Sequence, residues 1–144
     1  MTFLLDVNVL VALIAPDHPV HDAAHRWFDD EGQRGWATCP LTENGALRVL
    51  GDPKLESSPG TPGGVIPMLR SLLDQGQRTF WTDDLSLTAS PMIDATRLLR
   101  REDVTDTHLL ALAASRGGYL ATFDRKLRTD TVKGGRQTLF QIPT

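Results

Sequence analysis

The stretch that decides the fold is VTDTHLLALAASRGGYLATFD, residues 104–124. Thr105 is suited to cap a helix, and Asp106 would lie in its first turn, where the helix dipole favours negative charge. Leucines and alanines form the helix body, and the Gly117-Gly118 pair ends it. A short buried strand follows, with Asp124 at its exit. Strand exits and helix N-termini lie along one edge of a parallel α/β sheet, so both carboxylates are expected to share one crevice.

The same alternation of short apolar runs and helical periodicity extends through the chain. It predicts strands over residues 2–6, 36–39, 79–81, 119–123 and 138–142. It predicts further helices over residues 7–14, 20–28, 41–50, 65–73 and 93–99. We therefore expect an α/β fold with a central, mostly parallel sheet and helices on both faces.

Length and composition favour one domain over residues 1–144, with residues 51–64 as an internal loop rich in glycine and proline. The single cysteine, Cys39, excludes an internal disulfide and suits a reducing compartment. Asp6 and Asn8 interrupt the apolar N-terminal run, which also lacks a basic segment and a cleavage site. The run is typical of neither a signal peptide nor a membrane span. We expect a cytoplasmic protein.

Charge is distributed unevenly along the chain, whose formal net charge is -3. Residues 1–96 carry 6 Lys and Arg against 13 Asp and Glu, whereas residues 97–144 carry 9 against 5. The basic residues therefore surround the proposed acidic crevice. Basic flanks beside an acidic pocket suit a phosphodiester substrate, although a plain solvated surface would have the same composition.

Two further acids occupy positions equivalent to those of Asp106 and Asp124. Asp6 follows the first predicted strand, and Glu43 lies in the first turn of a predicted helix. Each acid alone could serve a helix terminus. Together they would repel, since two carboxylates ~4 Å apart cost on the order of 4 kcal/mol at an effective dielectric of 20. A divalent cation removes that penalty. Oxygen ligands without a Cys/His cluster favour Mg²⁺ or Mn²⁺ over zinc.

Four segments carry a family resemblance: FLLDVNVLVAL, LTENGALRVL, FWTDDLSL and the opening stretch itself. In this order and spacing, they resemble the PIN-domain ribonucleases that are the toxins of VapBC-type toxin–antitoxin pairs. The resemblance extends from residue 2 to about residue 142.

The resemblance implies a Mg²⁺- or Mn²⁺-dependent endoribonuclease that cuts tRNA or rRNA and leaves 5′-phosphate and 3′-hydroxyl ends. Asp6, Asp106 and Asp124 match the family's metal-binding acids, and Glu43 matches a fourth acid that either binds metal or holds the attacking water. The residues expected to support the pocket are Asn8, Thr122 and Thr105. The basic residues expected to contact RNA are Arg101, Arg125, Lys126 and Arg128.

The implied partners are a cognate VapB-like antitoxin, the RNA substrate and a second copy of the chain, with no membrane. Two alternatives are weighed against the nuclease. A PIN scaffold that only binds RNA or a protein partner would not need all four acids. A phosphatase of the haloacid-dehalogenase type would need a D-x-D pair, but Asn8 occupies its second position.

Other motifs have simpler interpretations. His18, His21 and His25 are expected on a partly exposed polar face rather than at a metal. Trp27 and Trp36 fall in core-periodic segments, whereas the role of Trp81 stays open. Asp103 and Asp130 are expected to be solvated loop residues.

Overall fold

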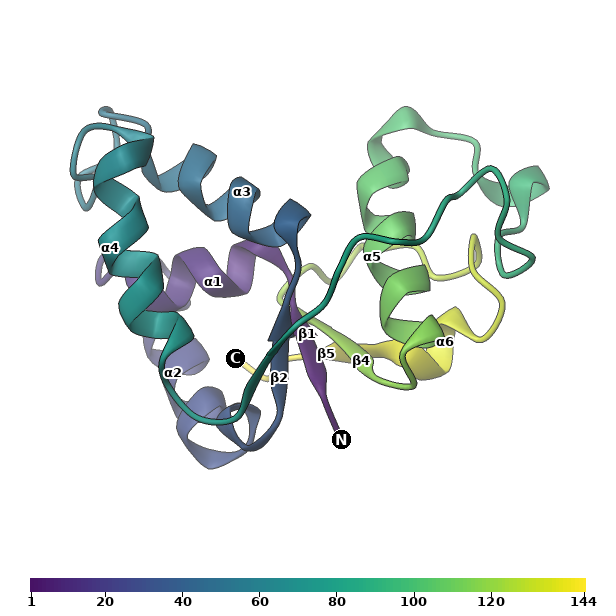
Figure 1. The fold of residues 1–144 in the computed structure, drawn as a ribbon, viewed down its shortest axis with the longest axis horizontal. Helices are drawn as coiled ribbons and strands as arrows, with labels where there is room; N and C mark the ends of the chain where they lie inside the picture. Colours follow the sequence, from purple (N-terminus) through teal and green to yellow (C-terminus); the bar gives the residue numbers. More distant parts are fainter.

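A five-stranded sheet organises the protein, in the order β3-β2-β1-β4-β5, with every neighbouring pair parallel (Figure 1). The computed structural model describes residues 1–144. The strands are β1 (Phe3–Leu5), β2 (Trp36–Thr38), β3 (Arg78–Phe80), β4 (Tyr119–Thr122) and β5 (Leu139–Gln141). In the register of the sheet, Phe3 of β1 pairs with Trp36 on one side and with Tyr119 on the other.

Helices cover both faces of this sheet. They are α1 (Val7–Ile14), α2 (His21–Asp30), α3 (Pro40–Leu50), α4 (Pro62–Leu73), α5 (Val104–Ser115) and the short α6 (Gly135–Thr138). Figure 1 shows α1 to α4 together on one side of the sheet, with α5 and α6 on the other. The predicted fold class is therefore confirmed. None of these helices has the length and apolar character that crossing a membrane requires.

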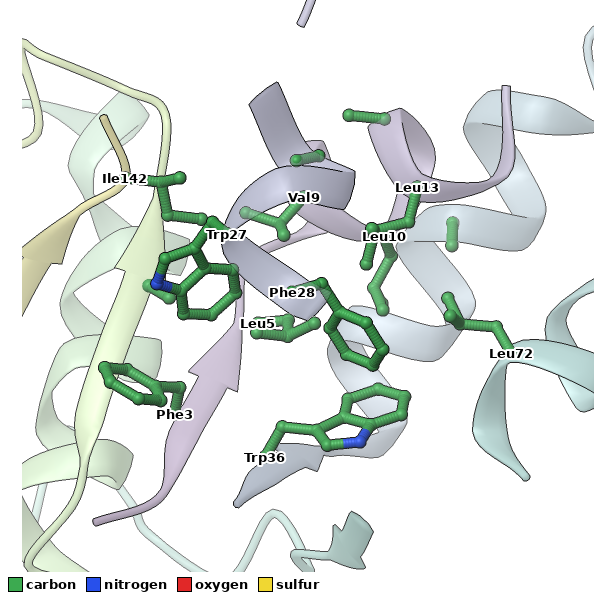
Figure 2. Close-up of a cluster of buried hydrophobic side chains, with 14 of the residues drawn as sticks. Phe3, Leu5, Val9, Leu10, Leu13, Trp27, Phe28, Trp36, Leu72 and Ile142 are labelled. Atoms are coloured by element: carbon green, nitrogen blue, oxygen red, sulfur yellow. The ribbon is translucent and has the colours of Figure 1, made fainter. Parts of the chain in front are cut away.

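Two apolar layers hold the helices onto the sheet. Figure 2 shows the layer beneath α1 and α2, where Trp27, Phe28 and Trp36 lie with Phe3 among aliphatic side chains. Phe28 meets Trp36 edge-on with ring centroids 5.2 Å apart, a favourable aromatic arrangement. Both Trp27 and Trp36 are buried, as predicted, and Trp81 is buried too, in the layer on the opposite face.

The strand order creates a switch point beside β1. The chain leaves β1 for β2 on one side, and it returns to β4 on the other side only after three more helices. Side chains at the carboxyl ends of β1 and β4 therefore face a common crevice, the usual ligand position in an open α/β sheet. The helix α3 packs close to this point, because a Cβ atom on Gly45 would lie 2.5 Å from Val7 Cγ2.

The start of α5 differs from the prediction. The N-cap is Asp103 rather than Thr105, which is exposed within the first turn, and a 3₁₀ turn over Arg101–Asp103 leads into the helix. Asp103 is also not a solvated loop residue. It is 5% exposed and forms a two-pronged interaction with Arg100, at 3.0 and 2.8 Å. A partner three residues earlier stabilises the buried carboxylate. The exposed Asp130 fits its prediction.

The helix predicted over residues 93–99 is wrong. Only a 3₁₀ turn forms there, over Ala95–Arg97. The Asp94 carboxylate accepts bonds from both the backbone N–H and the hydroxyl of Thr96, a local arrangement that competes with a helix. Leu99 is 78% exposed, so a helix here would bury no complete apolar face.

Helix α4 begins earlier than expected, within the segment predicted as a loop. Pro62 occupies its first turn, and the hydroxyl of the N-cap Thr61 accepts a bond from Gly64 N–H. Proline fits this position because the first turn needs no intrahelical N–H donor. Loop structure therefore covers residues 51–61.

Candidate active site

Asp6 lies at the centre of the candidate site, immediately after β1. It is the N-cap of α1, and its Oδ1 accepts a hydrogen bond of 2.8 Å from the Val7 N–H. Its Oδ2 accepts a second bond of 2.8 Å from the Thr122 hydroxyl on β4. The residue is only 7% exposed. Burial raises the pKa of Asp6, while these two bonds act in the opposite direction.

A small polar network ties the start of α1 to the end of β4. The Asn8 amide nitrogen donates to Thr122 Oγ1 at 3.2 Å, and its oxygen accepts from the Phe123 N–H at 3.4 Å. The Asp124 N–H also donates to Thr122 Oγ1, at 3.0 Å. Thr122 is fully buried. The predicted supporting residues Asn8 and Thr122 therefore fix the backbone that carries Asp6 and Asp124.

Asp106 approaches the same place from the other face of the sheet. It lies in the first turn of α5 and is half-buried. Burial, followed by the negative charges of Asp6, Asp124 and Asp103, raises the pKa of Asp106 to about 6. The three aspartates at residues 6, 106 and 124 are thus close enough to repel one another electrostatically.

We refer to their common hollow as the acidic cleft, which has a volume of ≈ 340 Å³. Its walls are formed by Asp6, Val7, Asn8, Val11, His18, Val49, Asp106 and Asp124. These residues come from both helical layers and from the ends of β1 and β4. The cleft lies at the switch point of the sheet, where a ligand is expected.

Glu43 is not part of this cleft. Its Oε2 accepts a bond of 2.6 Å from the Thr38 hydroxyl, and Thr38 in turn accepts from Arg78 at 3.3 Å. Glu43 instead lines a separate hollow of ≈ 240 Å³ between α3 and α4, with Arg70 and apolar side chains. The structure therefore brings three of the four predicted acids to one hollow, while the fourth lines the hollow between α3 and α4.

The side chains of the acidic cleft offer the kind of ligand atoms that a hard cation prefers. The cleft offers carboxylate oxygens and no thiolate, and its negative charges are uncompensated. No three His, Cys, Asp or Glu side chains of the chain are grouped closely enough to enclose an ion by themselves. Mg²⁺ commonly keeps several waters and binds only one or two protein carboxylates, so the open arrangement suits it.

The predicted RNA-binding residues lie outside the acidic cleft, as does Thr105. Arg125 donates to the Ile142 carbonyl at 2.6 Å, and Arg128 forms an ion pair with Asp130 at 3.2 Å. The Arg101 side chain is 95% exposed. Lys126 is exposed beside Asp124, and its backbone N–H donates to that carboxylate at 2.9 Å. These side chains lie on the surface of the C-terminal part of the chain.

The sequence did not indicate the contacts of two residues, Asp83 and His18. Asp83 accepts from the Leu41 N–H at 2.9 Å and contacts His108 Nε2 at 3.2 Å, so it links the first turn of α3 to α5. The sequence indicates that Asp83 follows a strand, but it does not indicate which residues Asp83 contacts. His18 lines the acidic cleft, whereas the sequence predicts it on a partly exposed polar face with two other histidines.

Those two histidines, His21 and His25, bond through ring nitrogens to the carbonyl oxygens of Ala12 and Leu13, at 2.7 and 2.8 Å. They fix α2 against the last turn of α1.

Comparison with known proteins identifies the family. A scan against models of protein families finds no match. The chain is 42% identical to ribonuclease VapC39 of Mycobacterium tuberculosis over 135 residues, which is 94% of this chain and 96% of that protein. It is 39% identical to ribonuclease VapC44 of the same species over 134 residues, 93% and 94% of the two chains. Ribonuclease VapC38 is 42% identical over 121 residues, 84% of each chain. The chain therefore belongs to the VapC family of PIN-domain toxins.

Proposed function

We propose that the protein is a Mg²⁺- or Mn²⁺-dependent endoribonuclease, the toxin of a VapBC-type pair, with tRNA or rRNA as its substrate class. The observation that carries this proposal is the acidic cleft, where Asp6, Asp106 and Asp124 share one hollow at the switch point of the sheet. The names of the similar ribonucleases support the same activity.

Asp6, Asp106 and Asp124 would hold the cation, directly or through water. When bound, Mg²⁺ or Mn²⁺ acidifies a water molecule and neutralises the charge that builds up on the phosphate. The chain's own residues prepare this chemistry. Thr122 and the Val7 N–H both bond the Asp6 carboxylate and favour its charged form. Near neutral pH, proton loss from Asp106 makes its carboxylate available to the cation.

Glu43 is proposed as the fourth acid of the family pattern, either as a ligand or as the group that holds the attacking water. Its carboxylate is bonded to Thr38 at the carboxyl end of β2, the strand beside β1. The surface residues Arg101, Arg125, Lys126 and Arg128 are proposed to contact RNA phosphates beyond the cleft.

Two protein partners belong to the proposal. A cognate VapB-like antitoxin would lay a C-terminal segment across the acidic cleft and place an Arg or Lys among the carboxylates. A second copy of the chain would form a homodimer. The uncompensated negative charge of the cleft supports the antitoxin proposal, because a cationic side chain would relieve it.

The test is cleavage of total RNA by the purified full chain after removal of any bound antitoxin. We expect cleavage with Mg²⁺ or Mn²⁺, none with excess EDTA, and new fragments that begin with 5′-phosphate. Asp6→Asn and Asp124→Asn should abolish cleavage. Asp22→Asn is the matched control, since Asp22 is an exposed acid on α2 outside the cleft.

The alternative is a non-catalytic module that binds RNA or a partner. Metal-independent RNA binding without any cleavage, unchanged by Asp6→Asn, would replace the nuclease proposal with that alternative. Mapping the 5′ ends of cleaved RNA after expression in cells would identify the substrate.

A further inference from the structure

His18 occupies a rigid turn between α1 and α2. Its backbone N–H donates to the Ala15 carbonyl at 3.1 Å, and its own carbonyl accepts from the His21 N–H at 3.0 Å. Pro16 and Pro19 flank the turn and restrict its backbone further. The side chain is therefore presented from a fixed backbone, and it lines the acidic cleft.

The imidazole ring is fixed in its tautomer as well as in its position. The Val20 N–H donates to His18 Nδ1 at 3.2 Å, so in the neutral ring this nitrogen is the acceptor and the proton lies on Nε2. No hydrogen bond within the chain uses Nε2. The His18 side chain lies between the acidic cleft and a neighbouring hollow of ≈ 150 Å³, and its Nε2–H has no acceptor within the chain.

Among the other polar side chains of the cleft, only Asn8 carries a donor, and one of its two amide hydrogens is bonded to Thr122. Asp6, Asp106 and Asp124 only accept hydrogen bonds when ionised. The Asn8 amide is held in place by its bonds to Thr122 and to the Phe123 N–H, so its orientation is set by the end of β4. A phosphodiester entering this cleft meets carboxylates, and it needs donors for the phosphate oxygens that a cation does not reach.

We propose that His18 is a substrate-binding residue of the acidic cleft, whose Nε2–H donates a hydrogen bond to a non-bridging oxygen of the RNA phosphate. This inference rests on the proposed nuclease function. It adds to the proposed active site a substrate-binding residue outside the four acids. It requires the neutral ring to act as a donor and involves no proton transfer.

Three substitutions separate this role from a structural one. The amide nitrogen of His18→Gln can reach the position of Nε2, whereas the amide oxygen of His18→Asn replaces only Nδ1, the acceptor for Val20 N–H. His18→Phe keeps the ring and removes both nitrogens. The matched control is His25→Gln, because His25 bonds to the Leu13 carbonyl and does not line the cleft.

The experiment measures cleavage of total RNA by each antitoxin-free variant with Mg²⁺, together with its thermal unfolding midpoint. We expect kcat/KM to fall about 10- to 100-fold in His18→Asn and His18→Phe, as for loss of a hydrogen bond to a charged group. His18→Gln should retain most of the activity. His25→Gln should cleave at the wild-type rate.

The outcomes distinguish the two proposals. If wild-type protein does not cleave RNA, the proposed function fails, and the role of His18 fails with it. If wild-type protein cleaves but His18→Phe cleaves equally well, only the His18 proposal is overturned. Rescue by Asn rather than by Gln would also overturn it, because it would show that His18 acts only by holding the turn through Nδ1.

Discussion

The Thr122 hydroxyl donates a hydrogen bond of 2.8 Å to the Asp6 carboxylate, which lies 116 residues earlier in the chain. The same oxygen accepts bonds from the Asn8 amide and the Asp124 backbone. A hydroxyl has one donor and two acceptor sites, so the capacity of Thr122 is fully used. This single buried side chain joins the two halves of the acidic cleft.

Thr122→Val is expected to lower the free energy of unfolding by about 1–3 kcal/mol, because it leaves a buried carboxylate without one of its donors. Since the bond from Thr122 lowers the pKa of Asp6, the substitution should raise that pKa further. The acidic limb of the pH–rate profile should then move to higher pH. Urea unfolding and RNA cleavage across pH measure the two effects.

Thr122→Ser is the control, since it keeps the hydroxyl and should remain near wild type in both measurements. A Val variant with unchanged stability and an unchanged pH profile would show that the bond to Asp6 has neither effect.

Asp106→Asn should stabilise the metal-free protein at alkaline pH while abolishing RNA cleavage. Burial and neighbouring carboxylates raise the pKa of Asp106 to about 6, above its ordinary value of 3.8. The folded protein therefore holds this proton more tightly than the unfolded chain does. Stability is lost as pH rises from 3.8 through 6, when the carboxylate becomes charged in the folded state.

Urea unfolding in EDTA at pH 8 and at pH 4 tests the direction of this change in stability with pH. The Asn variant should be more stable than wild type at pH 8, and the difference should shrink towards zero at pH 4. If Asp106→Asn were less stable than wild type, and more so at pH 8 than at pH 4, the result would contradict the repulsion between carboxylates described for the cleft.

Asp83→Ala should destabilise the protein by about 1–2 kcal/mol, because Asp83 caps the first turn of α3 and contacts His108 on α5. The neighbouring Asp84→Ala is the control. The Asp84 carboxylate is 67% exposed and pairs only with Arg116, so its removal should cost less than about 1 kcal/mol. Urea unfolding of the two variants in parallel measures the difference.

Gly45→Ala is expected to destabilise the protein by about 1–3 kcal/mol, since the new methyl group would overlap Val7 Cγ2 beside the cleft. Gly63→Ala offers the opposite case. It lies in the first turn of α4 with nothing within 4 Å of a new Cβ atom, so it should stabilise by about 0.5–1 kcal/mol. Equal effects at the two positions would argue against the tight contact between α3 and α1.

The elements that local chemistry determines were predictable from the sequence. Asp6 follows a short apolar run and caps a helix, and the pattern from Val104 to Thr122 contains a helix, a glycine stop and a strand. Because parallel strands end at one edge, these local patterns were enough to bring Asp6, Asp106 and Asp124 together.

What depended on contacts between distant segments was not predictable. Glu43 has the same local position as Asp106, but its carboxylate is bonded to Thr38 and lines the hollow between α3 and α4 rather than the acidic cleft. His18 faces the cleft because of a turn held by prolines and backbone bonds, which no periodic pattern indicates.

The bond between Thr122 and Asp6 also has a consequence for protein synthesis. On the ribosome, Asp6 emerges long before Asp106 and Asp124, and β4 pairs with β1 only after most of the chain has been translated. A nascent or prematurely terminated chain that lacks β4 would hold Asp6 without its partners. The cell would therefore meet an assembled acidic cleft only when translation of the toxin is nearly finished.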